Sequence, residues 1–387
     1  MTHCYYMQRA LSAARSALYM TSPNPRVGCV IVLHDQIIAT GATQAAGGPH
    51  AEVVALQQAR DAGFTDLQGA TVYVTLEPCS HQGRTPPCVD ALIAARPKIV
   101  VIAMLDPNPQ VSGQGVVKLR AAGIEVLFSS ELELEEALAL NVGFVSRMLR
   151  GVPWLWLKTA SSLDGRTALS DGQSKWITGA AARADGQRFR ARSCVVLTGI
   201  NTVLADNPQL NVRSISTPRQ PIRAVVDSQL RISPKAKIFD GEPVWIFTAV
   251  QLSSIDNDFK QRLAHKNAQI ITLVADDNGQ VCLHSLMRWL AEQQINEVHV
   301  EAGAILSGAL LEAGYVDALL SYLAPMLIGE GRPLVQMSPL PSLDLAPRFE
   351  LLQSRIMEKD VRLFMRHAQH WRQLLVKLKQ LQQNQTD

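Results

Sequence analysis

The chain has 387 residues, of which 47% are hydrophobic and 18% are charged, an ordinary globular composition with room for two or three domains. Its 37 basic and 34 acidic residues leave a net charge of +3, which argues against the polybasic surface of a nucleic-acid-binding protein. No apolar run approaches the length of a transmembrane span, and no basic segment followed by an apolar core opens the chain, so we expect neither a membrane protein nor a secreted one.

Strands and helices alternate through the first third of the chain. The hydrophobic spacing predicts helices at 3–20, 50–62 and 88–95, and strands at 27–33, 36–41, 71–76, 98–105 and 124–128. We therefore expect a three-layer α/β domain with a partly parallel sheet.

One imidazole and two thiols stand at the boundaries of these elements. His50 and Cys88 each open a predicted helix, and Cys79 lies just after a predicted strand. Such a set is typical of a catalytic zinc site, in which three protein ligands leave the fourth position for water. Glu52 follows His50 by two residues, and its carboxylate can carry protons between that water and a substrate. This is the constellation of zinc deaminases, although eight residues separate the cysteines here instead of two.

Two other interpretations of these residues stay open. The cysteines could be buried hydrophobic side chains without a metal. The zinc could also be structural, and His81 is then the candidate for a fourth ligand that closes the site. In a catalytic site we expect His81 in the substrate pocket instead.

The spacing of the cysteines indicates a reducing environment. The six cysteines are far apart in the sequence, at Cys4, Cys29, Cys79, Cys88, Cys194 and Cys282. Because this spacing is unlike a disulfide framework, we expect a cytoplasmic protein whose thiols stay free to bind metal.

Residues 1–147 resemble the deaminase domain of the bifunctional riboflavin-biosynthesis deaminase–reductases. The matching motifs are Asn24-Pro25-Arg26-Val27-Gly28, Gly48-Pro49-His50-Ala51-Glu52, the stretch 77–88, and Asp106-Pro107-Asn108-Pro109 with Gly113 and Gly115. The eight-residue gap between the cysteines is the pattern of that family. The resemblance implies a cytidine-deaminase-like fold with Zn²⁺ on His50, Cys79 and Cys88, Glu52 as the catalytic proton donor, and Asn24 against the pyrimidine ring.

A domain boundary follows these residues. The apolar spacing predicts a helix at 131–148, and Gly151-Val152-Pro153 stands just before a new strand. We expect a linker at 148–152, a second domain at 153–367 and a tail at 368–387.

The second domain again alternates strands with helices. We predict strands at 154–161, 194–199, 221–227, 243–248, 270–273, 297–301 and 316–323, with helices at 183–192, after 199, at 283–293 and at 305–313. It lacks the glycine-rich turn of a Rossmann unit, but the junctions 198–202 and 301–308 could hold phosphate on helix N-termini. Glycines there could equally serve only to allow tight turns. The guanidinium groups of Arg190 and Arg213 suit a phosphorylated substrate, with a solvated loop as the alternative.

Residues 153 to about 367 resemble the reductase domain of the same family. The matching motifs are the stretches 158–166, 174–178, 202–213, 221–228 and 300–303; Ala302 departs from the pattern because many relatives carry a second glycine there. The resemblance implies a dihydrofolate-reductase-like α/β fold that uses NADPH. It places NADPH on Ala160, Trp176, Thr202, Ser228, Gly303, Ala304, Ile305, Leu306, Ser307, Gly308 and Ala309. It places the substrate on Ser174, Arg190, Asp206, Leu210, Arg213 and Glu301.

The tail 368–387 shows an apolar face at helical spacing. We expect it to pack on its own chain or on a neighbouring subunit; a basic helix on a membrane surface is the alternative.

Together these features predict a bifunctional enzyme of riboflavin biosynthesis. Its partner would be a small phosphoribosylated pyrimidine, deaminated at a zinc site and then reduced by NADPH, with no nucleic acid or membrane involved and a homo-oligomeric assembly. Two rival hypotheses are a nucleic-acid base deaminase, which the charge balance disfavours, and a non-catalytic protein in which zinc only braces the fold.

Overall fold

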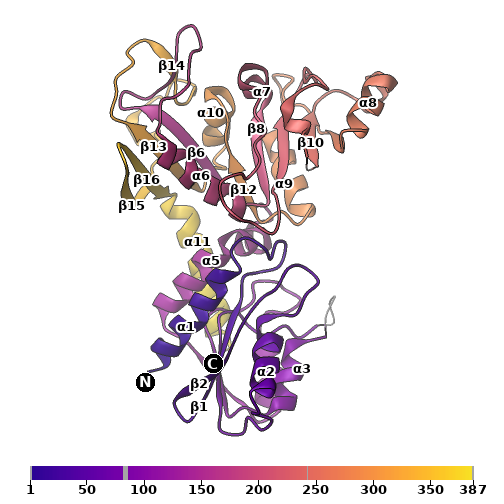
Figure 1. Cartoon of the computed structure of the whole chain (residues 1–387), viewed down its shortest axis with the longest axis vertical. Coiled ribbons are helices and arrows are strands. Elements are labelled where there is room, and N and C mark those ends of the chain that lie inside the picture. Colours follow the sequence, from indigo (N-terminus) through magenta and orange to yellow (C-terminus); the bar gives the residue numbers. More distant parts are fainter. Residues whose placement is uncertain (1, 82–85, 242, 386–387) are drawn as a thin grey trace. The chain divides into compact units, whose positions relative to one another are not determined.

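The computed structural model describes residues 2–81, 86–241 and 243–385. It divides into two compact units, Met1–Gly151 with Arg372–Asp387 and Val152–Trp371 (Figure 1). Most of the predicted tail, from Arg372 onward, therefore belongs to the first unit. No helix within the described ranges combines the length and the hydropathy needed to cross a bilayer.

The first unit is built on a five-stranded sheet in the order β2-β1-β3-β4-β5. Its strands are β1 (Gly28–Leu33), β2 (Gln36–Ala42), β3 (Thr71–Val74), β4 (Ile99–Ile102) and β5 (Glu125–Phe128). β1 runs antiparallel to β2 and β3, whereas β3, β4 and β5 are parallel. The sheet is partly parallel, as the sequence predicts.

Helices cover both faces of this sheet. They are α1 (His3–Ser16), α2 (Ala51–Asp61), α3 (Cys88–Ala95), α4 (Gln114–Ala121), α5 (Glu131–Arg150) and the later part of α11 (Ala368–Gln383). α1 contacts α5, and α2 contacts α3, which contacts α4. Figure 1 shows α1 and α5 on one side of the sheet and α2 and α3 on the other. The predicted three-layer α/β fold is confirmed.

Two glycines let helices lie directly on the strands. A Cβ on Gly28 would overlap the carbonyl oxygen of Ala10 in α1. A Cβ on Gly41 would overlap the carbonyl oxygen of Ala51, the first residue of α2. The absence of a side chain at Gly41 therefore sets how closely the start of α2 lies against β2. This start carries His50 at the N-cap and Glu52 in the first turn.

The second unit is built on a nine-stranded sheet in the order β11-β10-β9-β8-β12-β6-β13-β16-β15. These strands are β6 (Trp154–Ser162), β8 (Val195–Gly199), β9 (Ile222–Val226), β10 (Val244–Thr248), β11 (Ala268–Thr272), β12 (Glu297–Val300), β13 (Ala318–Ala324), β15 (Glu350–Met357) and β16 (Asp360–Arg366). All neighbours from β11 to β13 are parallel, and β16 and β15 close the sheet as an antiparallel hairpin. A separate pair joins β7 (Arg166–Leu169) to β14 (Gly331–Pro333).

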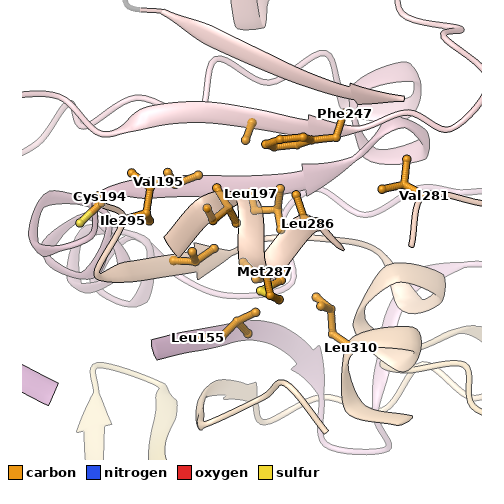
Figure 2. Packing of buried hydrophobic residues seen from close by; sticks show 14 of the residues in the cluster. Leu155, Cys194, Val195, Leu197, Phe247, Val281, Leu286, Met287, Ile295 and Leu310 are labelled. Carbon is orange, nitrogen blue, oxygen red and sulfur yellow. The ribbon is translucent and has the colours of Figure 1, made fainter. Parts of the chain in front are cut away.

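The core of the second unit lies between the parallel strands and two helices. The helices of this unit are α6 (Ala180–Arg192), α7 (Ile200–Asp206), α8 (Asn257–Ala264), α9 (Leu283–Glu292) and α10 (Ala304–Glu312). Figure 2 shows side chains from β6, β8, β10, α9 and α10 meeting in one cluster, among them Leu155, Leu197, Phe247, Met287 and Leu310. This packing buries one face of the parallel strands under helices. Such cover is expected because mainly parallel sheets are normally covered by helices.

The structure differs from the predicted elements at the end of α5 and after β13. α5 continues to Arg150 and ends at Gly151, whose φ of +71° is the left-handed conformation that glycine favours at a helix end. Residues 148–150 of the predicted linker are therefore helical. The prediction that strand 316–323 closes the series is also wrong, because β15 and β16 follow it.

Candidate active sites

The predicted metal ligands of the first unit converge at the start of two helices. His50 is the N-cap of α2, Cys88 is the first residue of α3, and Cys79 lies in the loop after β3. Nδ1 of His50 lies 3.2 Å from Sγ of Cys88 and 3.6 Å from Sγ of Cys79. The three ligand atoms all lie within 4.8 Å of one another.

These three residues fit a zinc ion. One imidazole and two sulfur atoms are the donors that zinc prefers. The backbone N–H of Cys88 donates to Sγ of Cys79 at 3.3 Å. A hydrogen bond from the Cys88 thiol, together with this N–H and His50, lowers the pKa of Cys79 to about 4, so a thiolate is available for metal. His81 is exposed and is not part of this cluster in the part of the chain that the structure describes, which leaves three ligands.

Glu52 lies beside the cluster in a buried position. Its side chain interacts with Cys88, and only 3% of the residue is exposed. Burial raises the pKa of Glu52 to about 7, and the negative charge of Cys79 adds to the increase. A carboxyl group with such a pKa both accepts and releases a proton near neutrality. Asn24 lies in the turn between α1 and β1, where its N–H donates to the carbonyl of Thr21 at 2.8 Å.

The second unit holds a cavity of about 1620 Å³. It lies at the carboxyl ends of the neighbouring parallel strands β9, β8, β12 and β6, the usual place for ligands in such sheets. The predicted NADPH residues that line it are Ala160, Thr202, Ser228, Gly303, Ala304, Ile305, Leu306 and Ala309. The predicted substrate residues that line it are Ser174, Asp206 and Glu301.

Other predicted residues of the second unit lie outside this lining. The side chains of Ser307 and Leu210 are buried, and Gly308 is packed so tightly that a Cβ would overlap the carbonyl of Gln336. Trp176 is 68% exposed and stacks under the guanidinium of Arg183. Arg213 is exposed, and its backbone N–H donates to Gln187.

Glu301 is the centre of charge at the cavity. Arg190 donates from both Nε and Nη2 to its carboxylate, the latter at 2.9 Å, and Nε2 of His299 lies 3.3 Å away. Burial alone would raise the pKa of Glu301, but Arg190, His299 and Lys158 hold it well below its usual range. Arg190 is therefore occupied by Glu301 and by the carbonyl of Asn211, and it reaches the cavity only through Glu301.

Comparison with known proteins identifies both units. The family model "RibD C-terminal domain" matches residues 153–363, and the model "Cytidine and deoxycytidylate deaminase zinc-binding region" matches residues 1–104. The riboflavin biosynthesis protein RibD of Escherichia coli K12 is 46% identical in an alignment of 370 residues, and the match covers 92% of this chain and 97% of that protein. The corresponding protein of Haemophilus influenzae is 44% identical, over 93% of this chain and 96% of its own length.

The chain belongs to the RibD family. The solved structure of Acinetobacter baumannii RibD, form 1, is 44% identical, with a TM-score of 0.84 over 94% of this chain and 98% of that one. A diaminohydroxyphosphoribosylaminopyrimidine deaminase/5-amino-6-(5-phosphoribosylamino)uracil reductase from Thermotoga maritima is 34% identical, with a TM-score of 0.82 over 94% of this chain and 98% of that one. The chain is thus a bifunctional enzyme of riboflavin biosynthesis, a zinc-dependent deaminase joined to an NADPH-dependent reductase.

Sequence reasoning missed Glu77 in the deaminase unit of this RibD-family chain. Its buried carboxylate accepts backbone N–H groups from Asp106 at 3.2 Å, Gly113 at 3.0 Å, Gly115 at 2.9 Å and Val116 at 3.4 Å. Glu77 thereby links the loop of Cys79 to the segment before α4 and to the first turn of α4. Its place in a strand-end motif was the only sequence signal.

Sequence reasoning also missed Lys158 in the reductase unit. This lysine lines the cavity, and its Nζ lies 3.9 Å from Oε2 of Glu301. Burial lowers the pKa of Lys158, while the charge of Glu301 opposes the decrease. The available signal was a single charged residue inside the otherwise uncharged strand β6.

Proposed function

We propose that the chain acts twice on one phosphoribosylated diaminopyrimidinone. The first site replaces an exocyclic amine with oxygen, and the second reduces the ribosyl chain to a ribityl chain. The observation that carries this proposal is the convergence of His50, Cys79 and Cys88 beside buried Glu52, in one chain with the large cavity around Glu301.

In the deaminase unit, proton transfer falls to Glu52. His50, Cys79 and Cys88 would hold zinc, which when bound supplies an activated water. The Glu52 carboxylate accepts a proton from the attacking water and delivers it to the exocyclic nitrogen, which leaves as ammonia. A pKa of about 7 suits both transfers. Asn24 would contact the pyrimidine ring.

In the reductase unit, NADPH and the substrate would bind next to each other at the strand ends. NADPH, when bound, supplies a hydride for the sugar carbon attached to nitrogen. Ala160, Thr202, Ser228 and the lining part of the 303–309 turn would hold it. Ser174, Asp206 and Glu301 would hold the substrate, with Arg190 fixing Glu301. Trp176, Ser307, Gly308, Leu210 and Arg213 are proposed as contacts from the resemblance alone.

The proton for the reduced substrate would come from Lys158. Glu301 is a poor donor because its pKa is held well below the usual range. The Lys158 ammonium lines the cavity, and burial lowers its pKa, so it gives up a proton more readily than an exposed lysine.

A single assay tests the two activities together. Purified protein is mixed with the phosphoribosylated diaminopyrimidinone and NADPH, and released ammonia and nicotinamide absorbance are followed. We expect one ammonia for each NADPH consumed. Ammonia release without NADPH oxidation, or neither, contradicts the proposal.

We also propose that two copies associate through β15. This strand forms the edge of the nine-stranded sheet, and it exposes Leu351, Leu352 and Ile356. An exposed apolar edge strand favours pairing with a second copy. The Ile356→Lys variant should therefore shift the mass measured by light scattering to that of a monomer; an unchanged mass speaks against this edge.

We place the deaminase in residues 1–147, the reductase in 153–367 and the enzyme in the cytoplasm. No disulfide links any of the six cysteines, all of which lie within the described residues, and this suits a reducing compartment.

A further inference from the structure

The end of the chain holds none of the residues that the proposed function assigns to either reaction. The two family models match residues 1–104 and 153–363, so α11 lies outside both. Yet Leu374 and Leu378 on this helix are fully buried. This part of α11 therefore packs within the deaminase unit.

The end of α11, together with Asn384 and Gln385 that follow it, contacts α4 and the segment before it. Nη1 of Arg120, in α4, donates to the carbonyl of Gln385 at 2.6 Å. The side-chain amide of Gln385 covers Gly113, where a Cβ would overlap it. Nε2 of Gln382 donates to the carbonyl of Ala103 at 3.4 Å, just after β4.

α5 holds the same helix from another direction. Nζ of Lys377 donates to the carbonyl of Leu149 at 3.2 Å, and Lys379 pairs with Glu131. Glu131 and Leu149 lie near opposite ends of α5. The end of α11 is therefore attached to α5 as well as to α4.

On its other side, α4 contacts the loop that carries Cys79. The N–H groups of Gly115 and Val116 donate to Glu77, and Nζ of Lys118 donates to the carbonyl of Ser80 at 2.8 Å. A Cβ on Gly115 would overlap the carbonyl of Pro78, so α4 lies directly on this loop. These contacts fall on residues 77, 78 and 80, the immediate neighbours of Cys79.

We propose that Gln382 and Gln385 are positioning residues of the deaminase site. They hold α4 and the segment before it against residues 77–80, and so they fix the place of Cys79 relative to His50 and Cys88. The proposal rests on the proposed deaminase activity of this site. It assigns to a helix encoded after the reductase a role in the other reaction.

The test uses the full-length, zinc-loaded chain with both glutamines replaced by alanine, Gln382→Ala with Gln385→Ala. The matched control is Gln380→Ala, an exposed glutamine on the same helix. We expect the deaminase kcat to fall about tenfold, because a small displacement of a reacting group is costly. The reductase rate, measured on the deaminated intermediate, should stay unchanged. The control should match the original chain in both rates.

Hydrogen exchange separates positioning from simple stabilisation. In the double variant, the amides of Gly113, Gly115 and Val116 should exchange several-fold faster at an unchanged melting temperature. Arg120→Ala should act in the same direction, and Arg120→Lys, which keeps a donor for Gln385, should restore part of the loss.

Two results would overturn the proposal. One is unchanged exchange at these amides together with an unchanged deaminase kcat. The other is an equal loss in the Gln380→Ala control. If the original chain shows no deamination at all, the proposed function fails, and the exchange comparison still decides whether the end of α11 holds α4.

Discussion

The surroundings of buried Glu52 and partly buried Glu301 shift the pKa values of these two glutamates in opposite directions. Glu52 lies close to a thiolate, and burial with that charge raises its pKa to about 7. Glu301 is surrounded by Arg190, His299 and Lys158, which hold its pKa well below the usual range in spite of burial. Glu52 is therefore suited to moving protons, and Glu301 to holding a fixed negative charge.

Replacing Glu52 tests the first role. Glu52→Gln should lower deamination by about 10²- to 10⁴-fold, because an amide keeps the shape but carries no proton between water and nitrogen. Ammonia release measures the loss, and zinc analysis should show unchanged metal content. Reduction of the deaminated intermediate is the internal control. Deamination within tenfold of the original rate would contradict this role.

Replacing Lys158 tests the proposed proton donor of the reductase. Lys158→Met should lower the NADPH oxidation rate at saturating substrate by about 10²-fold, because it removes the ammonium and keeps the length of the side chain. Lys266→Met, at an exposed lysine of the same unit, is the matched control. A change confined to the apparent substrate constant would indicate binding without proton donation.

Acid should weaken the second unit through Glu301. Its folded-state pKa lies below the unfolded value of about 4.3, so its contribution to stability is present above that pH and is lost as pH falls through the folded pKa. Glu301→Gln should therefore cost about 3 kcal/mol at neutral pH, and the difference from the original chain should shrink below about pH 4. Urea unfolding at several pH values measures both; a difference that stays constant into acid would contradict this account.

At the scale of elements, buried strands were the most predictable part of the fold. β8 begins with three apolar residues and is almost entirely buried, and such short apolar runs are visible in the sequence. β15 was missed because it is exposed along nearly its whole length and lacks the alternation of a half-buried strand. α4 was missed because Gly113 and Gly115 resemble turn residues, whereas Gly115 is needed for contact with Pro78.

The same distinction holds for the two sites. His50, Cys79 and Cys88 could be grouped as metal ligands from the sequence. Each stands at an element boundary, where spacing and residue type indicate a metal site. Glu77 and Lys158 act through contacts between segments distant in the sequence, and no local pattern records such contacts. The resemblance named the cavity residues that strand ends supply, but it could not show that Arg190 is bound to Glu301.

Gly41 offers a test of how an element positions the metal ligands. Gly41→Ala should displace the start of α2, because the added Cβ overlaps the carbonyl of Ala51. Overpacking of this kind costs about 1–3 kcal/mol, and zinc affinity and deamination should fall with it. Gly186→Ala, in a roomier position of α6, is the control. A Gly41→Ala variant with unchanged zinc affinity would contradict this role for the glycine.

At the scale of the molecule, the two activities should separate when the metal is removed. A zinc chelator should abolish ammonia release and leave NADPH oxidation with the deaminated intermediate unchanged, because the metal ligands all lie in the first unit. Zinc should restore deamination. A thermal melt recorded alongside shows whether the first unit stays folded; loss of both activities at once would contradict two independent sites.

The assignment of Arg372–Asp387 to the first unit has a consequence for biosynthesis. A ribosome delivers residues 1–151 early, yet the helix that completes this unit emerges only after the whole reductase has been translated. Domains translated first usually fold first. Here the first unit cannot complete its packing until α11 has been translated. A premature stop codon downstream of the reductase would therefore damage the activity encoded at the start of the message.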